Sequence, residues 1–127
     1  MLSLRPAPAG AEQINPPYDN NPNIIHWVFY RYNSRDPAIK MRALENFAGI
    51  TDALGYANAV LVGDKREPLY CQPRNLAISV GQHIELLQRW VQKLRASDPT
   101  PAYQIKIENM PTAAAMLVAL QEEFPCK

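Results

Sequence analysis

Two cysteines and two histidines are the side chains of this 127-residue chain with the greatest potential for chemistry. Cys71 precedes a predicted helix that starts at Ser79, and a thiol near a helix N-terminus can be an activated nucleophile. His83, within about one turn of that start, could act as its base. No glycine-rich oxyanion loop or known nucleophile signature surrounds Cys71, so a catalytic pair is the weaker interpretation.

The two cysteines also bracket the two most regular helical patterns of the chain. Cys71 lies before a helix expected over residues 80–96, and Cys126 follows a helix that ends near Phe124. If these helices pack antiparallel, both sulfurs lie at the same end of the pair and a disulfide is feasible. Closing this loop would stabilise the fold by roughly 4 kcal/mol and would indicate an oxidising compartment. Two unpaired buried cysteines are the alternative.

The remaining titratable groups show no catalytic or metal-binding pattern. Positions 26, 71, 83 and 126 lack the short ligand spacings of zinc sites, so we expect neither a metal nor a cofactor. Glu122 and Glu123 are adjacent and point in different directions on a helix, and Asp52 stands alone. Acid–base catalysis needs a paired set of such groups, so the sequence predicts a protein that is not an enzyme.

The composition of the chain limits its partners and its number of domains. Thirteen basic and twelve acidic residues leave a net charge of +1, which gives no electrostatic case for nucleic acid or an anionic membrane. No apolar run approaches the roughly 18 residues that a membrane span needs. With 47% hydrophobic residues, the chain can form one domain with a modest core.

We expect a flexible N-terminal tail over residues 1–21 and a helical domain over residues 22–127. The tail lacks a hydrophobic period and the apolar central region of a signal peptide. Its PAPAGA segment resembles the small-residue end of such a peptide, which favours a mature or trimmed form of an exported protein. A disordered tail on a cytosolic protein is the alternative.

The domain is predicted to be all-α, a small bundle of about four helices joined by short linkers. A first helix is expected over about 22–32, although its residues also suit a strand. Asp36 and Pro37 begin a second helix that ends near 55 and could extend to 61. Gly49 and Gly55 weaken this helix and would let another helix approach closely. Its inner face is expected to consist of Leu44, Phe47, Thr51 and Leu54, with Ile50 beside them.

The later helices have clearer boundaries. Ser79 and Gln82 fit a capping box that begins the helix over 80–96. Its buried stripe is expected to consist of Val80, Ile84, Leu87, Val91 and Leu94. Residues 103–107 alternate as in a short strand, although no partner strand is evident. A last helix opens at Pro111 and is ended by Pro125, and its inner face is expected to consist of Ala113, Leu117, Leu120 and Phe124.

A charged loop is the candidate partner-binding site. It consists of Asp64, Lys65, Arg66 and Glu67. Loops held on a rigid scaffold are common binding sites, whereas the alternative is an ordinary solvated turn. An aromatic cluster near the start is interpreted as core packing, with a dimer or partner interface as the alternative. The cluster consists of Trp27, Phe29, Tyr30 and Tyr32.

Four short motifs follow one another along the second half of the chain. They are Tyr70-Cys71-Gln72-Pro73, Ser79-Val80-Gly81-Gln82, Met110-Pro111 and Phe124-Pro125-Cys126. Together they resemble the C-terminal half of the type VI secretion immunity family that protects bacteria from peptidoglycan amidase effectors (the Tai family). Residues 47–52 resemble an aromatic-x-Gly-x-x-Asp segment of the same family. The extra cysteine that members often carry on the earlier helix is not present.

The resemblance implies a small, all-helical periplasmic protein without catalytic activity, usually a homodimer, with a disulfide between Cys71 and Cys126. Such a protein binds a cognate cell-wall amidase and occupies its substrate cleft. The contacts vary with the effector, so the resemblance assigns no inhibitory residue. A second hypothesis is a small periplasmic acid-activated chaperone, which would expose apolar surface on acidification, or another helical exported binding protein.

Overall fold

The computed structural model describes residues 18–127 of the chain and has five helices within them. They are α1 (Ile25–Tyr32), α2 (Pro37–Gly63), α3 (Val80–Ser97), α4 (Pro101–Glu108) and α5 (Thr112–Glu123). This part of the chain contains no β-strand, and an isolated β-bridge joins Ile24 to Pro111. The prediction of a small all-α domain is therefore confirmed. The tail expected over residues 1–21 falls largely outside the described residues.

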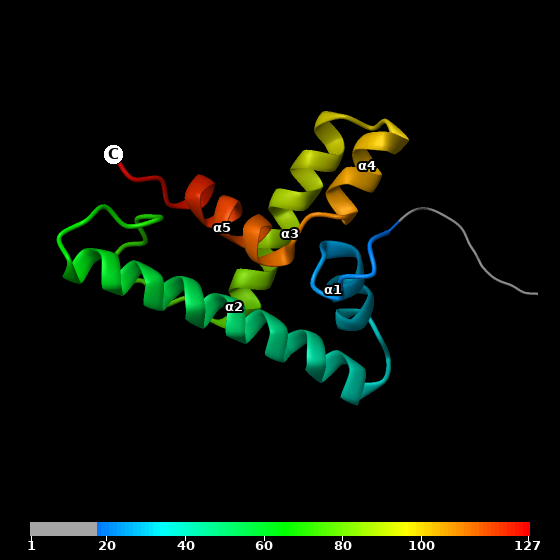
Figure 1. The fold of residues 1–127 in the computed structure, drawn as a ribbon, viewed down its shortest axis with the longest axis horizontal. Coiled ribbons are helices and arrows are strands. Elements are labelled where there is room, and N and C mark those ends of the chain that lie inside the picture. Colours follow the sequence, from blue (N-terminus) through cyan, green and yellow to red (C-terminus); the bar gives the residue numbers. More distant parts are fainter. Residues whose placement is uncertain (1–17) are drawn as a thin grey trace, which may run out of the picture.

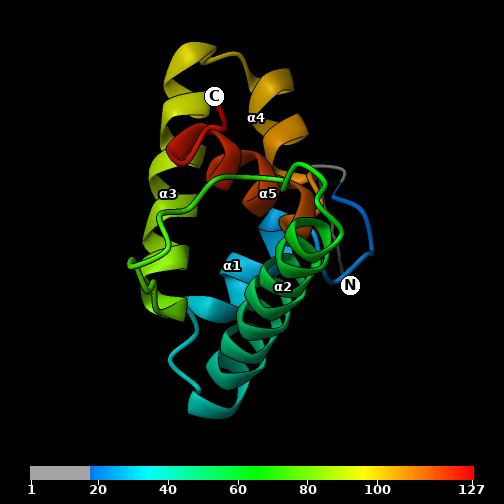
Figure 2. The same ribbon diagram turned by 90° about the vertical axis from the view of Figure 1, so that its left-hand side faces the viewer.

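α3 contacts α2, α4 and α5, and α2 contacts α1, α3 and α5. The longest helix, α2, has 27 residues and runs along the lower edge of the molecule in Figure 1. α1 packs beside the N-terminal half of α2 and also contacts α4 (Figure 2). α5 contacts both α2 and α3, so it closes the domain on the side where the chain ends.

All five helices contribute side chains to one core. Phe47 of α2 is fully buried, and its ring centroid lies 5.6 Å from that of Phe29 and 6.0 Å from that of Tyr32. Phe29 and Tyr32 are partly buried against this core, whereas Tyr30 is exposed. The other large, fully buried side chains are Ile24, Ile25, Val28, Ile84, Leu87, Ile107, Thr112, Met116 and Leu120.

The residues around the start of α1 join the first part of the described chain to its last part. The Ile25 N–H donates to the Met110 carbonyl at 2.8 Å. The Thr112 N–H donates to the Asn23 carbonyl at 2.9 Å. These two bonds flank the bridge between Ile24 and Pro111, so the start of α1 and the start of α5 are positioned together.

Two helix starts agree with the capping motifs in the sequence. The Asp36 carboxylate accepts from the Ala38 N–H at 2.9 Å, and Pro37 stands in the first turn. The Ser79 hydroxyl accepts from the Gln82 N–H at 3.1 Å, and the Gln82 side chain accepts from the Ser79 N–H at 2.8 Å. This reciprocal capping box gives partners to two N–H groups that would otherwise be unpaired at the helix end.

The strand expected over residues 103–107 is wrong, because this segment forms α4. Thr100 caps the helix by accepting from the Tyr103 N–H, and Pro101 stands in the first turn. Tyr103 and Ile107 are four residues apart, so they lie on the same side of the helix, and Ile107 is fully buried. A strand would need a partner strand, whereas the cap stabilises a helix locally.

α2 is longer than expected and its glycines have a different environment. The helix continues to Gly63, beyond the expected ends at 55 or 61, and Asp64 is its C-cap residue. No heavy atom lies within 4 Å of the position that a Cβ atom would occupy at Gly49 or Gly55. The expected close approach of another helix to these glycines therefore does not occur within the described domain.

The inner face of α5 is rotated by about one position from the expected face. The buried residues of α5 are Thr112, Ala115, Met116, Ala119 and Leu120. Of the four residues expected there, Leu120 is fully buried, Leu117 and Phe124 are partly buried, and Ala113 is exposed. The prediction gave weight to the larger side chains, whereas alanines make much of the actual contact.

Replacing Phe47 by Ala is expected to lower the free energy of unfolding by about 3–5 kcal/mol, because the core cannot fill the resulting cavity. Met41→Ala changes an exposed side chain on the same helix and is expected to alter this free energy by less than about 0.5 kcal/mol. Urea denaturation followed by circular dichroism measures both variants. Equal losses would contradict the central position of Phe47 in the core.

Candidate partner-binding surface

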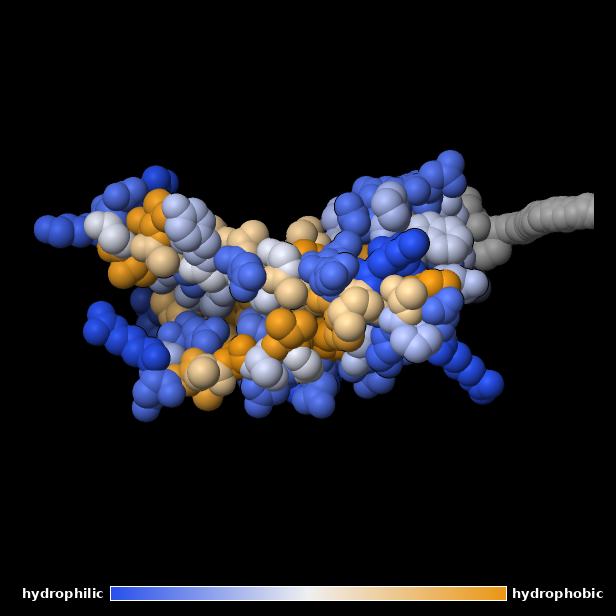
Figure 3. Space-filling view, turned by 90° about the horizontal axis from the view of Figure 1, so that it is seen from below, coloured by the Kyte–Doolittle hydropathy of each residue, from blue (hydrophilic) through white to orange (hydrophobic). Residues whose placement is uncertain are grey.

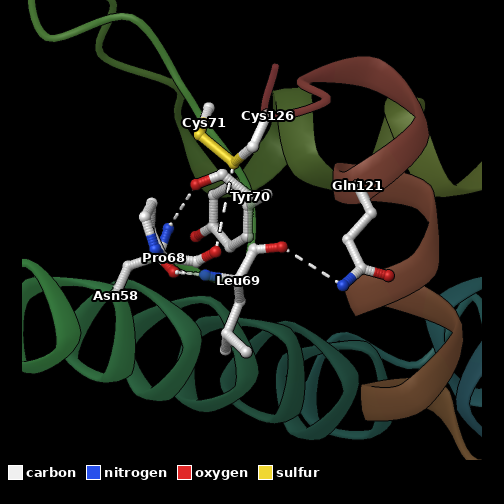
Figure 4. Close-up of a disulfide and its surroundings, with 7 residues drawn as sticks. All are labelled: Asn58, Pro68, Leu69, Tyr70, Cys71, Gln121 and Cys126. Carbon is white, nitrogen blue, oxygen red and sulfur yellow. Dashed lines mark hydrogen bonds between the residues drawn. A yellow bond between two sulfur atoms is a disulfide. The ribbon is translucent and has the colours of Figure 1, made fainter. Parts of the chain in front are cut away.

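A disulfide joins Cys71, in the segment between α2 and α3, to Cys126 beyond the end of α5 (Figure 4). The Cα atoms lie 5.0 Å apart, although the two cysteines are separated by 55 positions in the sequence. The Cys71 N–H also donates to the Phe124 carbonyl at 2.8 Å. The expected pairing is confirmed, and the alternatives of a thiol nucleophile and of two unpaired cysteines are excluded.

Asn58 of α2 fixes the two residues that precede the disulfide. Its side-chain oxygen accepts from the Leu69 N–H at 2.7 Å, and its side-chain nitrogen donates to the Tyr70 carbonyl at 2.9 Å. From the other side, Gln121 of α5 donates to the Leu69 carbonyl at 3.1 Å (Figure 4). The segment is thus attached to both α2 and α5. Asn58 could not be identified from the sequence, because one asparagine within a helix forms no spacing pattern.

The charged loop of Asp64, Lys65, Arg66 and Glu67 follows α2 directly and is exposed throughout. Lys65 has a left-handed backbone conformation with φ of 58°, and the Arg66 N–H donates to the Leu61 carbonyl at 2.8 Å. The backbone therefore forms a tight turn on the end of the helix. The four side chains make no hydrogen bond or ion pair with another residue in 18–127, so a partner could contact them without breaking internal bonds. Their role in binding stays a prediction.

The outward side of α2 carries exposed apolar side chains next to this loop. Tyr56 is 73% exposed and Val60 44%, whereas Val62, 53% exposed, lies on the side of the helix that faces the segment over 68–76. Asp52 is the one charged residue between positions 46 and 63. Figure 3 views the molecule from the α2 side, where hydrophobic and neutral side chains form a band between hydrophilic ends. Contiguous apolar surface of this kind often marks a site of protein–protein contact.

Two hollows flank the outward side of α2. The larger, of about 780 Å³, lies between the C-terminal half of α2 and the segment over 68–76. Its α2 side is formed largely by small residues, Gly55, Ala59 and Gly63. The smaller, of about 430 Å³, lies between α2 and the start of α5, and residues that line it include Gly49, Ile50, Ala53, Leu54 and Ala113. Because glycine has no side chain, these positions leave room for side chains of a partner.

The histidines make structural contacts. His26 Nδ1 lies 2.9 Å from Glu108 Oε1, and Glu108 also pairs with Arg95. His83 Nδ1 lies 2.9 Å from the Ser79 carbonyl oxygen. Within residues 18–127, no group of three or more histidine, cysteine or acidic residues could hold a metal ion. Over the same residues, no helix is both long and apolar enough to cross a membrane.

Comparisons of the chain with protein-family models, with curated proteins and with solved structures found no match. The candidate surface therefore rests on the residues themselves: the disulfide-held segment, the charged loop and the outward side of α2. All three combine a fixed backbone with exposed side chains. A fixed backbone that presents exposed side chains is typical of a protein-binding surface.

Replacing both cysteines by serine is expected to lower the free energy of unfolding by about 2–5 kcal/mol, because the unfolded chain loses its covalent constraint. Urea denaturation of the variant and of the unreduced wild type measures the difference. Titration of the unfolded, unreduced wild type should find no free thiol. Two free thiols would contradict the disulfide.

Burial raises the pKa of the Tyr70 phenol above its ordinary value of about 10. The folded state then retains a proton that the unfolded state releases, so this stabilisation is complete below pH of about 10 and is lost as the pH rises through the folded-state pKa. The free energy of unfolding should fall in this alkaline range, and less steeply for Tyr70→Phe. Urea denaturation at several alkaline pH values checks this; equal slopes would show that another group is responsible.

Proposed function

We propose that this protein is a periplasmic immunity protein that binds and blocks a peptidoglycan amidase effector of type VI secretion. The observation that carries the proposal is the disulfide between the cysteine of the Cys-Gln-Pro motif and that of the terminal Phe-Pro-Cys motif. The resemblance to the Tai family rests partly on these two motifs and implies this pairing. A disulfide also favours an oxidising compartment, such as the periplasm. The proposal includes a homodimer, which the resemblance implies as well.

Inhibition of this kind needs no chemistry from the inhibitor, but it needs a surface that fits the amidase cleft. The charged loop is attached to α2 at one end, and Asn58 and the disulfide hold the chain shortly after its other end. A segment held in this way loses little conformational entropy on binding, which favours tight association. Val62 and Leu76, both exposed, line the larger hollow beside the loop and would form the apolar centre of the contact.

The experiment measures how the purified protein inhibits hydrolysis of peptidoglycan sacculi by the amidase effector encoded beside its gene. We expect complete inhibition by the wild type at a small molar excess. The double variant Lys65→Ala/Arg66→Ala removes two charges from the rim of the proposed contact, so its Kd should rise about tenfold. Isothermal titration calorimetry gives both dissociation constants.

The matched control is Arg89→Ala/Lys93→Ala, which removes two exposed charges from α3 and should leave the Kd unchanged. A wild-type protein that does not inhibit would reject the immunity function. If the wild type inhibits the amidase but the loop variant has the same Kd, the immunity function stands and the charged loop is rejected as part of the contact. Suppression of protein aggregation at low pH, without amidase inhibition, would support an acid-activated chaperone instead.

A further inference from the structure

The two cysteines of the disulfide differ in their access from outside the protein. Cys71 is exposed and lines the larger hollow beside α2. Cys126 is half-buried and is not among the residues that line this hollow. Thiol–disulfide exchange depends on which sulfur an attacking thiolate can reach. A thiolate that enters the larger hollow therefore meets Cys71 and not Cys126.

A backbone carbonyl further distinguishes the two sulfurs. Cys126 Sγ lies 3.9 Å from the Pro68 carbonyl oxygen (Figure 4). The partial negative charge of this oxygen repels a thiolate that approaches Cys126. In the reduced protein, the Cys126 thiol can donate to the same oxygen, which keeps the thiol beside Cys71. Cys126 is therefore suited to complete the bond from within the protein, whereas Cys71 is suited to exchange with an external reagent.

Hydrogen bonds to the backbone position the two cysteines independently of the bond between them. The Cys71 N–H donates to the carbonyl of Phe124, which lies two residues before Cys126. Asn58 of α2 forms one hydrogen bond with the backbone of each of the two residues before Cys71. These hydrogen bonds involve no sulfur atom, so they can form in the reduced chain as well. The folded domain then holds both thiols close together before they are joined.

We propose that Cys71 is the residue at which a thiol–disulfide oxidoreductase acts on this protein, and that the folded domain presents Cys126 to complete the bond. The reagent is an enzyme whose own disulfide joins two nearby cysteines, as in a Cys-x-x-Cys motif. The reaction has two exchange steps, and each step is the attack of a thiolate on a disulfide sulfur.

In the first step, the Cys71 thiolate attacks one sulfur of the oxidoreductase disulfide. A mixed disulfide forms between Cys71 and that sulfur, and the second sulfur of the oxidoreductase leaves as a thiolate. In the second step, the Cys126 thiolate attacks the sulfur of Cys71, which forms the bond between the two cysteines and releases the oxidoreductase. Two electrons pass to the oxidoreductase, which becomes a dithiol, and its two thiolates take up the protons that the two thiols of this protein lose.

This inference goes beyond the proposed function and does not depend on the amidase. The exchange takes place while the chain matures, and the larger hollow is free for another partner once the disulfide has closed. The experiments that test the exchange use no amidase, so their failure would leave the proposed immunity function in place.

The first experiment uses glutathione to map the attacked sulfur in the folded wild type. The oxidised protein is exposed briefly to reduced glutathione, and free thiols are then blocked with iodoacetamide. Peptide mass spectrometry should find glutathione on Cys71 and the blocking group on Cys126, at least about tenfold more often than the reverse. In concentrated urea, where both sulfurs are exposed, this excess should disappear. Equal labelling of the two cysteines in the folded protein, or glutathione mainly on Cys126, would overturn Cys71 as the exchange site.

The second experiment tests the partner with a purified Cys-x-x-Cys oxidoreductase. Its second cysteine is replaced by serine, and its first is activated as a mixed disulfide with thionitrobenzoate. Reduced Cys126→Ser should displace thionitrobenzoate and join the oxidoreductase at least about tenfold faster than reduced Cys71→Ser. Equal rates, or no mixed disulfide with either variant, would overturn the oxidoreductase as the reagent. Circular dichroism establishes that the variants are folded; if either is not, the glutathione map of the wild type decides the exchange site.

The third experiment tests Asn58 as a positioning residue. The equilibrium of the protein with a glutathione buffer measures the effective concentration of the two thiols for one another. This concentration should be at least about a hundredfold higher in the folded wild type than in concentrated urea. Asn58→Ala should lower the folded-state value about three- to tenfold. The matched control, Asn46→Ala, removes a hydrogen bond to Asn23 elsewhere on α2 and should leave the value unchanged.

The positioning of the thiols by the folded domain would be overturned by an effective concentration that is no higher in the folded wild type than in urea. Equal values for Asn58→Ala and Asn46→Ala would overturn the role of Asn58. A reduced wild type that circular dichroism shows to be unfolded would also contradict the inference, because the two thiols would then not be held together before the bond forms.

Discussion

The covalent bond between Cys71 and Cys126 is the constraint on which most of this structure depends. It closes a loop that contains α3, α4 and α5, so three of the five described helices lie between its ends. A small domain buries a limited core. The disulfide lowers the conformational entropy of the unfolded chain, and the resulting stabilisation is a large share of the net free energy of unfolding. The bond also attaches the segment after α2 to the end of α5. The position of the charged loop follows from this attachment, with Asn58 as the second point of fixation.

Local signals account for what the sequence predicts correctly. The capping box of Ser79 and Gln82, and the pair Asp36 and Pro37, act within a few residues, so they need no knowledge of the tertiary fold. The pairing of the cysteines is predicted from two consecutive antiparallel helices, whereas in the structure α4 separates α3 from α5 and Asn58 of α2 holds the residues before Cys71. α4 is different, because Thr100 and Pro101 follow closely after the end of α3, and such residues are typical of a helix end as well as of the cap of a new helix.

Contacts between elements account for what the sequence does not predict. The buried alanines of α5 depend on how closely its backbone approaches its neighbours, and side-chain size gives no guide to that distance. The hydrogen bonds of Asn58 depend on where a loop eleven residues later folds back. The exposure of the charged loop could be predicted from its composition. The exposed apolar side of α2, with Tyr56 and Val60, could not, because the same helix also has a core-facing stripe, and periodicity alone does not separate the two sides.

The pairing of residues 23–25 with residues 110–112 determines when this fold can form. α1 packs on α2, the next helix in the chain, but residues 23–25 pair with the start of α5, so this pairing completes only when that part of the chain is present. Contacts so distant in sequence slow folding, because a long stretch of chain must close before they form. A chain that emerges N-terminus first can therefore pair α1 with α2 early, and it completes the contacts of residues 23–25 only when the start of α5 has emerged.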